Sequence, residues 1–324
     1  MWVWVIFITV IILFLALDLG VFNKEDHVIR SKEAAMWTAV WVTLALSFSG
    51  GIYWLFSQGL VDNPTELTPG NAVLKYITGY LIELSLSIDN VFVIAVIFSA
   101  FAIPPIYQHR VLFWGILGAI VFRALMILFG VALINRISWI IYVFGVFLLY
   151  TAYKMLQAGD HEFKPKESFI FKQITKIFPI TRDLNGNRFL VKRMGITAAT
   201  PLLLALIIIE ITDILFALDS IPAILAITAD PFIVFSSNIL AILGLRSMYF
   251  LVSRMLSKFR FINYSLVVIL AFVGTKMLLS HHVKVPEWLS LSVIVISLVG
   301  GILASVYIPE KEEEDEPEDP AAEG

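Results

Sequence analysis

The sequence predicts an all-α polytopic membrane protein of about nine transmembrane helices, six of which form two inverted three-helix repeats. Three observations carry this prediction: an apolar composition, a series of long apolar stretches, and an acidic motif that occurs twice. Hydrophobic residues make up 59% of the 324 residues and charged residues only 15%, with a mean hydropathy of +0.87. A soluble protein of this length would need more polar surface to cover its core.

Each apolar stretch is long enough to cross a hydrocarbon layer of about 30 Å at a rise of about 1.5 Å per residue. The first stretch has neither a basic n-region nor a small-residue cleavage site, so we expect a retained helix and not a signal peptide. The stretches are residues 2–22, 35–57, 72–101, 111–133, 137–156, 196–227, 233–252, 262–279 and 287–308.

The basic residues predict the orientation, because Lys and Arg near the ends of spans stay on the cytoplasmic side. They gather after the first span and in the third, fifth and seventh connections. The alternate connections hold little beyond Arg136 and Lys284. We therefore expect the N-terminus outside and the C-terminus in the cytoplasm.

The acidic motif reads ELSLSIDN at residues 83–90 and DILFALDS at residues 213–220. Each copy has two carboxylates six positions apart, and the second is followed by an amide or hydroxyl side chain. An Asp at the centre of a lipid-facing helix costs roughly 2.5–3.5 kcal/mol on insertion scales. Acids at this depth are therefore expected to face inward and to serve a function.

Two further segments repeat in the same order after each acidic motif. Residues 122–126 (FRALM) resemble 245–249 (LRSMY), and residues 152–156 (AYKML) resemble 274–278 (GTKML). Because the repeat unit has an odd number of helices, the second copy must cross the membrane in the opposite sense. Inverted repeats of this kind are typical of secondary transporters, whose substrate site lies near the midplane where the repeats meet.

This organisation divides the chain into six regions. In the central loop, the sequence of residues 169–178 is equally compatible with an amphipathic helix at the membrane surface and with a plain loop. Residues 185–186 predict a hairpin turn. The regions are an N-terminal two-helix hairpin (1–71), the first repeat (72–156), a cytoplasmic basic loop (157–195), the second repeat (196–279), a final transmembrane helix (280–309) and a disordered acidic cytoplasmic tail (310–324).

The side chains available at the predicted midplane favour a hard divalent cation. Carboxylate, amide and hydroxyl oxygens suit Mn²⁺, Mg²⁺ or Ca²⁺, whereas zinc and copper favour imidazole and sulfur. The chain has no cysteine, and we expect no histidine inside a span. The candidate metal ligands are Asp89, Asp219, Glu83, Asp213, Asn90, Ser220, Glu210 and Asp18.

Other charged residues have alternative interpretations. Arg123 and Arg246 are candidates for charge balance or gating, and the alternative is that they form structural ion pairs with the buried acids. Residues six positions apart lie about 120° apart on a helix, so both acids of a motif meet one ion only if the helix bends or unwinds. Pro222 supplies a candidate break in the second copy. For Lys154 and Lys276 we expect snorkelling to the membrane surface.

The motif segments resemble the signature of the TerC/Alx family of bacterial integral membrane proteins. The resemblance covers nearly the whole chain and is carried by residues 82–92, 210–223, 230–232 and 242–249. It implies a manganese exporter in the bacterial cytoplasmic (inner) membrane. Some members of the wider family are instead linked by name to tellurium resistance, or are thought to supply metal to secreted enzymes.

We therefore expect a secondary transporter that exports a divalent cation, most simply Mn²⁺, by alternating access. Its partners are the ion and the lipid bilayer, with protons as the coupling ion because clustered acids favour protonation when the ion is absent. No tightly bound cofactor, nucleic-acid partner or enzymatic chemistry is expected. Two alternatives stay open: a membrane partner that supplies metal to exported proteins, and an oxyanion transporter. The sequence does not indicate an oligomeric state.

Overall fold

A computed structural model describes residues 2–22, 31–137, 139–158, 180, 181, 184, 186–193, 196–253, 261–280, 283 and 285–308. The predicted amphipathic segment 169–178 and the acidic tail 310–324 lie outside these residues.

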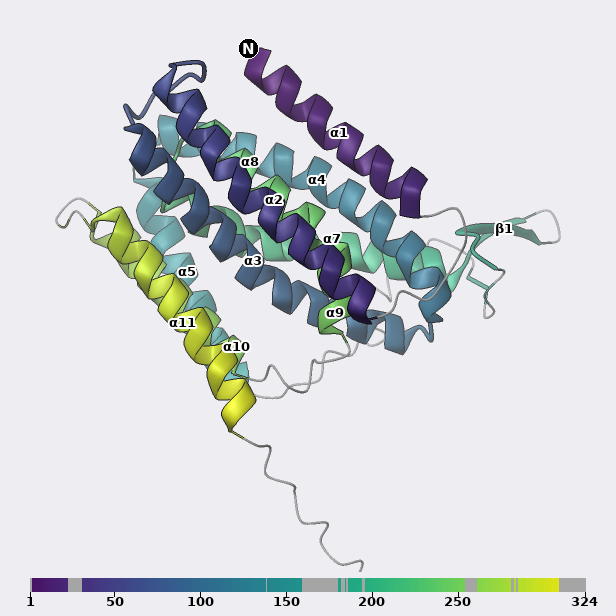
Figure 1. The fold of residues 1–324 in the computed structure, drawn as a ribbon. Coiled ribbons are helices and arrows are strands. Elements are labelled where there is room, and N and C mark those ends of the chain that lie inside the picture. The colour runs from purple at the N-terminus through teal and green to yellow at the C-terminus, as the bar shows by residue number, and fades with distance from the viewer. Residues whose placement is uncertain are drawn as a thin grey trace, which may run out of the picture.

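Long helices make up almost all of the described structure (Figure 1), so the predicted all-α membrane class is confirmed. The only strands among the described residues, β1 (Leu190–Arg193) and β2 (Ile196–Ala199), form one antiparallel pair. The helices are α1 (Trp2–Phe22), α2 (Ser31–Ser57), α3 (Pro69–Ala100), α4 (Pro105–Arg136), α5 (Ile140–Ala158), α7 (Pro201–Leu225), α8 (Pro231–Leu243), α9 (Leu245–Val252), α10 (Ile262–Leu278) and α11 (Glu287–Tyr307).

Proline is the first residue of α3, α4, α7 and α8. Its fixed φ suits the first turn of a helix, where its missing N–H would have no partner in any case. Asp230 caps α8, because its carboxylate accepts hydrogen bonds from the backbone N–H groups of Phe232 and Ile233, both at 3.0 Å. The local sequence thus specifies where the central helices begin.

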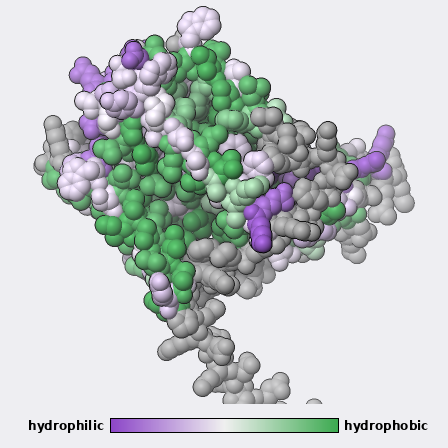
Figure 2. Space-filling model, viewed as in Figure 1, coloured by the Kyte–Doolittle hydropathy of each residue, from purple (hydrophilic) through white to green (hydrophobic). Residues whose placement is uncertain are grey.

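The outer faces of the helices are apolar. Figure 2 shows hydrophobic residues over most of the helical surface, with hydrophilic residues gathered towards its two ends. Exposed apolar patches of this extent indicate contact with lipid. Examples of exposed large apolar side chains are Leu125 and Phe129 on α4, Val146 on α5, and Ile296 and Val306 on α11.

Six described helices are long and apolar enough to cross a membrane, and the pair α8 and α9 makes a seventh if it counts as one bent span. Two shorter apolar segments, Trp2–Ala16 within α1 and the helix α10 (Ile262–Leu278), fall below that length. The chain is therefore a multi-pass membrane protein, while the total of nine spans stays a prediction.

Helix α3 lies among α2, α7, α8 and α11, and α7 packs between α3 and α4. A Cβ at Gly79, early in α3, would lie 2.8 Å from Cδ1 of Ile224 near the end of α7. Late in α3, Ile97 instead lines a cavity together with Ile209, which lies early in α7. The two acid-bearing helices therefore run in opposite directions, as Figure 1 also shows.

Helices α5 and α10 cross closely at a pair of glycines. A Cβ at Gly274 would lie 2.9 Å from the carbonyl oxygen of Gly145, so only glycine fits this crossing. Each helix of the predicted first repeat thus packs against its counterpart in the second: α3 on α7, α4 on α8, and α5 on α10. This pairing fits the repeat interpretation, although the inverted repeat itself stays a prediction.

The structure corrects two predictions about breaks in the helices. Pro222 does not interrupt α7, which continues to Leu225, and α3 is helical throughout, so neither acidic motif is unwound. The predicted continuous span 233–252 is broken at Gly244, where α8 and α9 meet at a bend of 44°.

The predicted hairpin turn at residues 185–186 is also misplaced. Gly186 does lie in a turn, with a φ of 61°. The paired strands are instead Leu190–Arg193 and Ile196–Ala199, and Ile180 pairs with Ala199. Residues 196–199 are apolar enough to have been assigned to the following span, whereas helix α7 begins only at Pro201.

Candidate functional site

The two acidic motifs bring a carboxylate to the middle of two central helices. Glu83 lies 14 residues from the start of α3 and 17 from its end, and Asp213 lies 12 residues from either end of α7. Both residues are buried, with exposed fractions of 1% and 8%. In helices that span the hydrocarbon layer, these positions lie near the midplane.

Both carboxylates bind Arg123 of α4. The guanidinium donates from Nε to Asp213 Oδ2 at 3.2 Å and from Nη2 to Asp213 Oδ1 at 2.9 Å, which is a bidentate pair. Its Nη1 donates to Oε1 of Glu83. Arg123 is only 1% exposed, so its bonds to Glu83 and Asp213 are buried ion pairs. This is the structural role that was predicted as the alternative to charge balance or gating. We call these three side chains the Arg123 triad.

The Arg123 triad has a formal charge of −1, because two carboxylates face one guanidinium. Charges removed from water are stable only when they are paired and hydrogen-bonded. Asn238 of α8 adds a further partner, since its Nδ2 donates to Glu83 Oε2 at 2.8 Å. With both carboxyl groups ionised, the triad carries one negative charge more than Arg123 balances, and such a charge attracts a cation.

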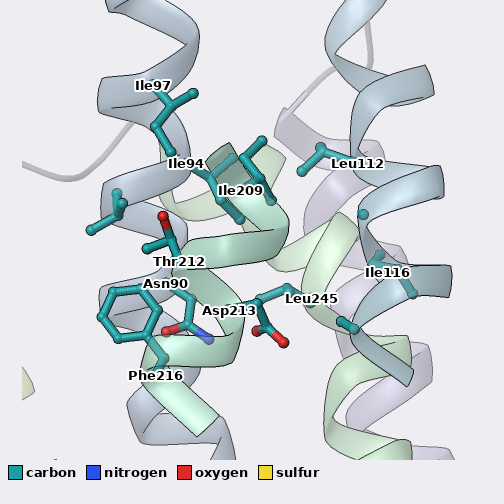
Figure 3. A pocket seen from close by; sticks show the side chains of 13 residues that line it. Asn90, Ile94, Ile97, Leu112, Ile116, Ile209, Thr212, Asp213, Phe216 and Leu245 are labelled. Atoms are coloured by element: carbon teal, nitrogen blue, oxygen red, sulfur yellow. The ribbon is translucent and has the colours of Figure 1, made fainter. Parts of the chain in front are cut away.

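A small cavity of about 20 Å³ lies beside Asp213 between α3, α4 and α7. This volume accommodates about one water-sized body. Figure 3 shows Asn90, Thr212 and Asp213 bringing oxygen atoms to a lining that is otherwise apolar. With its amide oxygen turned towards Arg123, Asn90 accepts from Nη2 at 3.3 Å. Asn90 and Asp213, both predicted ligands, therefore meet at one cavity.

The other acid of the second motif lies elsewhere. Asp219 accepts a hydrogen bond from the Thr151 hydroxyl of α5 at 2.9 Å, and so faces a different helix from Asp213. Six residues of regular helix separate the two acids by about 9 Å along the axis. The structure therefore does not bring Asp213 and Asp219 together. Ser220, beside Asp219, is 1% exposed and its Oγ has no hydrogen-bond partner among the described residues.

Glu210 lies one turn before Asp213 and packs against α4 at Gly118. A Cβ at Gly118 would collide with the Glu210 carboxylate, so this contact requires glycine. One carboxylate oxygen, Oε2, is buried and has no hydrogen-bond partner in the described structure. Glu210 is therefore placed close to the site without being part of the Arg123 triad.

Two candidates remain open because their side chains lie outside the described part of the chain: Asp18 in α1 and Asp89 in α3. Among the side chains that are described, no three His, Asp or Glu residues are grouped closely enough to hold a metal ion. Any metal site in this state would therefore need Asp89, Asp18 or neutral oxygen ligands, or a different arrangement of the acids.

Arg246 of α9 lies with Nη1 3.3 Å from Nε2 of His109 on α4. Nearby, the Tyr249 hydroxyl donates to Gln108 Oε1 at 3.0 Å, so two contacts join α9 to the start of α4. The expectation that spans contain no histidine is wrong here, because α4 begins at Pro105 and not at residue 111.

Lys276 takes part in a polar network, and its predicted snorkelling to the membrane surface stays a prediction. Its Nζ donates to Ser290 Oγ at 2.9 Å and lies 3.5 Å from Oε2 of Glu287 in α11. Lys75 of α3 pairs with the same carboxylate at 3.2 Å. This network links α3, α10 and α11 at the end of the molecule opposite to the β-hairpin. Lys154, by contrast, is exposed.

Sequence reasoning missed Asn238, Thr151 and His109. Asn238 carried a usable signal, because it is an amide within a predicted transmembrane span. Thr151 and His109 carried none, since one is a common helical residue and the other lies at a helix end.

The family described as the integral membrane protein TerC family matches residues 68–313. The chain belongs to the TerC family. The matched range runs from α3 into the segment after α11, so it includes the Arg123 triad and Asn238 but not Asp18 in α1. The resemblance inferred from the motifs is therefore confirmed.

Individual relatives are similar over almost their whole length. An uncharacterized membrane protein of Myxococcus xanthus is 50% identical over 303 residues, which cover 94% of this chain and 91% of the relative. An uncharacterized membrane protein of Rickettsia bellii is 42% identical, with 94% and 96% covered. A Photorhabdus laumondii protein named "Putative membrane-bound redox modulator Alx" is 42% identical over 306 residues, with 94% of each covered. No solved structure matches the chain.

Proposed function

We propose that this TerC family protein is a secondary transporter that exports a hard divalent cation, with Mn²⁺ as the best-fitting substrate. The observation that carries the proposal is the meeting of Glu83 and Asp213, from two antiparallel helices, at the buried Arg123. Buried intramembrane acids mark ion pathways. Secondary transporters bind their substrates at midplane positions of this kind.

The chemistry of the surrounding atoms supports a hard ion. The polar groups at the cavity are the amide of Asn90, the hydroxyl of Thr212 and the carboxylate of Asp213, all of which offer oxygen. Oxygen ligands suit Mn²⁺, Mg²⁺ and Ca²⁺. The cavity is too small for a fully hydrated ion, so the substrate must lose water to these ligands. The choice of Mn²⁺ over Mg²⁺, and export over import, rests on the family resemblance.

In this structure, the positively charged guanidinium of Arg123 lies between the two carboxylates, where the proposed divalent cation would bind. If a divalent cation replaced the guanidinium between Glu83 and Asp213, the formal charge of the group would change from −1 to 0. The same two carboxylates cannot bind both cations fully, so substrate binding requires Arg123 to withdraw. Movement of α4 relative to α3 and α7 is thus a natural link between binding and alternating access.

Protons are the coupling ion that this arrangement favours. When the substrate leaves before Arg123 returns, Glu83 and Asp213 would carry two negative charges in a poorly solvated place. Like charges at close range favour protonation of one carboxyl group. We propose that the N-terminus lies outside, that the C-terminus is cytoplasmic, and that the cation moves outward across the bacterial cytoplasmic membrane as protons move inward.

The alternative functions predict different behaviour. An oxyanion transporter needs uncompensated positive charge, whereas Arg123 is fully occupied by two carboxylates. A partner that supplies metal to exported proteins, or a redox modulator such as the relatives' name suggests, would show little transport on its own. Thiol exchange is not open to this chain because it has no cysteine.

Reconstitution into proteoliposomes tests the proposal. We expect the wild type to accumulate Mn²⁺ in preference to Mg²⁺, Ca²⁺ and Zn²⁺, and to do so faster when a pH gradient is imposed. Glu83→Gln and Asp213→Asn should each abolish Mn²⁺ accumulation, because each removes the charge of one of the two buried carboxylates that meet at Arg123. Uptake is measured with a Mn²⁺-quenched fluorophore inside the vesicles.

Asp62→Asn is the matched control, since it makes the same chemical change at an exposed position between α2 and α3. It should transport like the wild type. If the wild type shows no divalent-cation transport, or if both motif variants transport at the control rate, the proposed function is wrong. Transport that ignores the pH gradient and releases no protons contradicts only the proton coupling.

A further inference from the structure

Helix α8 carries three consecutive polar residues, Ser236, Ser237 and Asn238, each 0% exposed. The two serines are satisfied within their own helix. Ser236 Oγ donates to the Ile233 carbonyl at 3.4 Å, and Ser237 Oγ donates to the same carbonyl at 2.7 Å. Hydroxyl groups often bond back to the preceding turn in this way. Only Asn238 reaches beyond α8.

Only one of the two polar atoms of the Asn238 side chain has a hydrogen-bond partner among the described residues. Its Nδ2 donates to Glu83 Oε2 at 2.8 Å, which fixes the orientation of the amide because an ionised carboxylate only accepts. The remaining atom, Oδ1, is buried and has no hydrogen-bond partner among the described residues. An unsatisfied buried carbonyl is rare in native proteins and indicates a missing water, ion or function.

A second unsatisfied oxygen lies at the same level. Four residues after the contact between Gly79 and Ile224, Glu83 of α3 comes level with Ser220 of α7, because the helices run in opposite directions. Ser220 Oγ is buried and also has no partner in the described structure. Asn238 Oδ1 and Ser220 Oγ are thus two neutral oxygens from the second half of the chain that lack a hydrogen-bond partner among the described residues.

We infer that Asn238 is a substrate-site residue, whose Oδ1 is a neutral oxygen ligand for the divalent cation while its Nδ2 positions Glu83. This inference rests on the proposed function and extends it, since neither the acidic motif nor the family match assigns Asn238 a role. A carboxamide oxygen is a ligand that hard divalent ions accept. Because it is neutral, it adds coordination without adding to the charge of Glu83 and Asp213.

Binding of Mn²⁺ to the purified full-length protein tests the inference, with free Mn²⁺ followed by its electron paramagnetic resonance signal. Asn238→Leu keeps the side chain branched at Cγ but removes both the oxygen and the donor. Asn238→Asp keeps an oxygen ligand but removes the donor to Glu83. If Oδ1 is a ligand, Asn238→Leu should weaken Mn²⁺ affinity by about 10–100-fold, and Asn238→Asp should bind at least tenfold more tightly than Asn238→Leu.

A purely structural role predicts the opposite order. A carboxylate at position 238 would repel Glu83 Oε2, so a residue that only positions Glu83 would suffer more from Asp than from Leu. Ser236→Ala is the matched control, because it changes a neighbouring buried residue whose hydroxyl bonds within α8, and it should bind like the wild type. Monodispersity and the thermal midpoint in detergent, without metal, establish that each variant is folded.

Three results would overturn the inference: Asn238→Leu binding Mn²⁺ like Ser236→Ala, Asn238→Asp binding more weakly than Asn238→Leu, or no variant at position 238 being folded. The last would assign Asn238 to the stability of the fold. If the wild type itself binds no Mn²⁺, the proposed function is wrong and the inference falls with it, so the two failures are distinguishable.

Discussion

A single buried arginine joins the two acids that the repeated motif supplies. Arg123 has five N–H donors in a planar fork. The structure uses them on Asp213 and Glu83, and Nη2 also donates to Asn90 when the Asn90 amide oxygen is turned towards it. No other residue type could bind one carboxylate in a bidentate manner and a second at the same time. The function of the site depends on how strongly this internal cation competes with the substrate.

Arg123→Gln should destabilise the metal-free protein by about 3–5 kcal/mol, because it leaves two buried carboxylates without a counter-charge. Saturating Mn²⁺ should then stabilise the variant more than it stabilises the wild type, since no guanidinium competes for the carboxylates. Thermal unfolding in detergent, with and without Mn²⁺, measures both effects.

Arg136→Gln is the control for this substitution, because Arg136 is exposed at the end of the same helix. It should leave the thermal midpoint almost unchanged. A metal-free Arg123→Gln protein as stable as the control would exclude a buried charge pair of this strength. A larger stabilisation by Mn²⁺ in the wild type would exclude competition between Arg123 and the ion.

At the residue scale, the sequence identified the chemistry but not the partners. The acidic motifs and Arg123 are recognisable because charges are rare in apolar segments. Pairing of Arg123 with buried acids was one of the predicted alternatives, but which acids it binds was not predictable, because that depends on the rotation of each helix about its axis. A rotation of one residue turns a side chain by about 100°. This is why Asp213 and Asp219, from the same motif, bind Arg123 and Thr151 on different helices.

The packing of α4 on α7 depends on small residues that leave room for an acid. Gly118 lies against the Glu210 carboxylate, so a methyl group there would overlap the acid. One helical turn earlier, a methyl group at Gly115 would lie 3.5 Å from Cγ2 of Ile209, which is an ordinary contact distance. The two glycines therefore differ sharply in what a methyl group would meet. Alanine substitutions at Gly118 and Gly115 can therefore be compared within the same contact between α4 and α7.

Gly118→Ala should destabilise the protein by about 1–3 kcal/mol, because the new methyl group overlaps the Glu210 carboxylate and forces α4 and α7 apart. Gly115→Ala should have little effect on the same thermal unfolding transition. Adding Glu210→Ala to Gly118→Ala should restore most of the lost stability. Equal effects of the two glycine substitutions, or no restoration in the double variant, would rule out this packing arrangement.

At the element scale, the predicted starts of four central helices, at residues 72, 111, 196 and 233, differ from the observed starts by two to six residues. Pro69, Pro105, Pro201 and Pro231 each begin a helix, and the proline ring explains why. The break at Gly244 was not predictable, since glycine is tolerated in many membrane helices. The strands β1 and β2 were missed because residues 196–199 continue the apolar run of the following helix.

The distribution of charge over the whole molecule predicts its orientation in the membrane. Basic residues gather around the β-hairpin end, where Arg188 and Lys192 are exposed. The connection between α2 and α3 holds the acids Asp62 and Glu66. The positive-inside rule then places the β-hairpin in the cytoplasm and the α2–α3 connection outside.

Cysteine labelling tests this orientation cleanly, because the native chain has no cysteine. In intact cells, Asp62→Cys should react with a membrane-impermeant maleimide. Arg188→Cys should react only after the membrane is permeabilised. The reverse pattern would invert the topology, and with it the proposed direction of transport.

The central claim is that acids on α3 and α7 bind one divalent cation in exchange for Arg123. Anomalous scattering from crystals grown with Mn²⁺ tests it most directly. The account predicts one manganese peak between α3 and α7, within coordination distance of carboxylate oxygens from both helices, with Arg123 withdrawn from at least one of them. A manganese site elsewhere in the molecule, with Arg123 still bound to both Glu83 and Asp213, would contradict it.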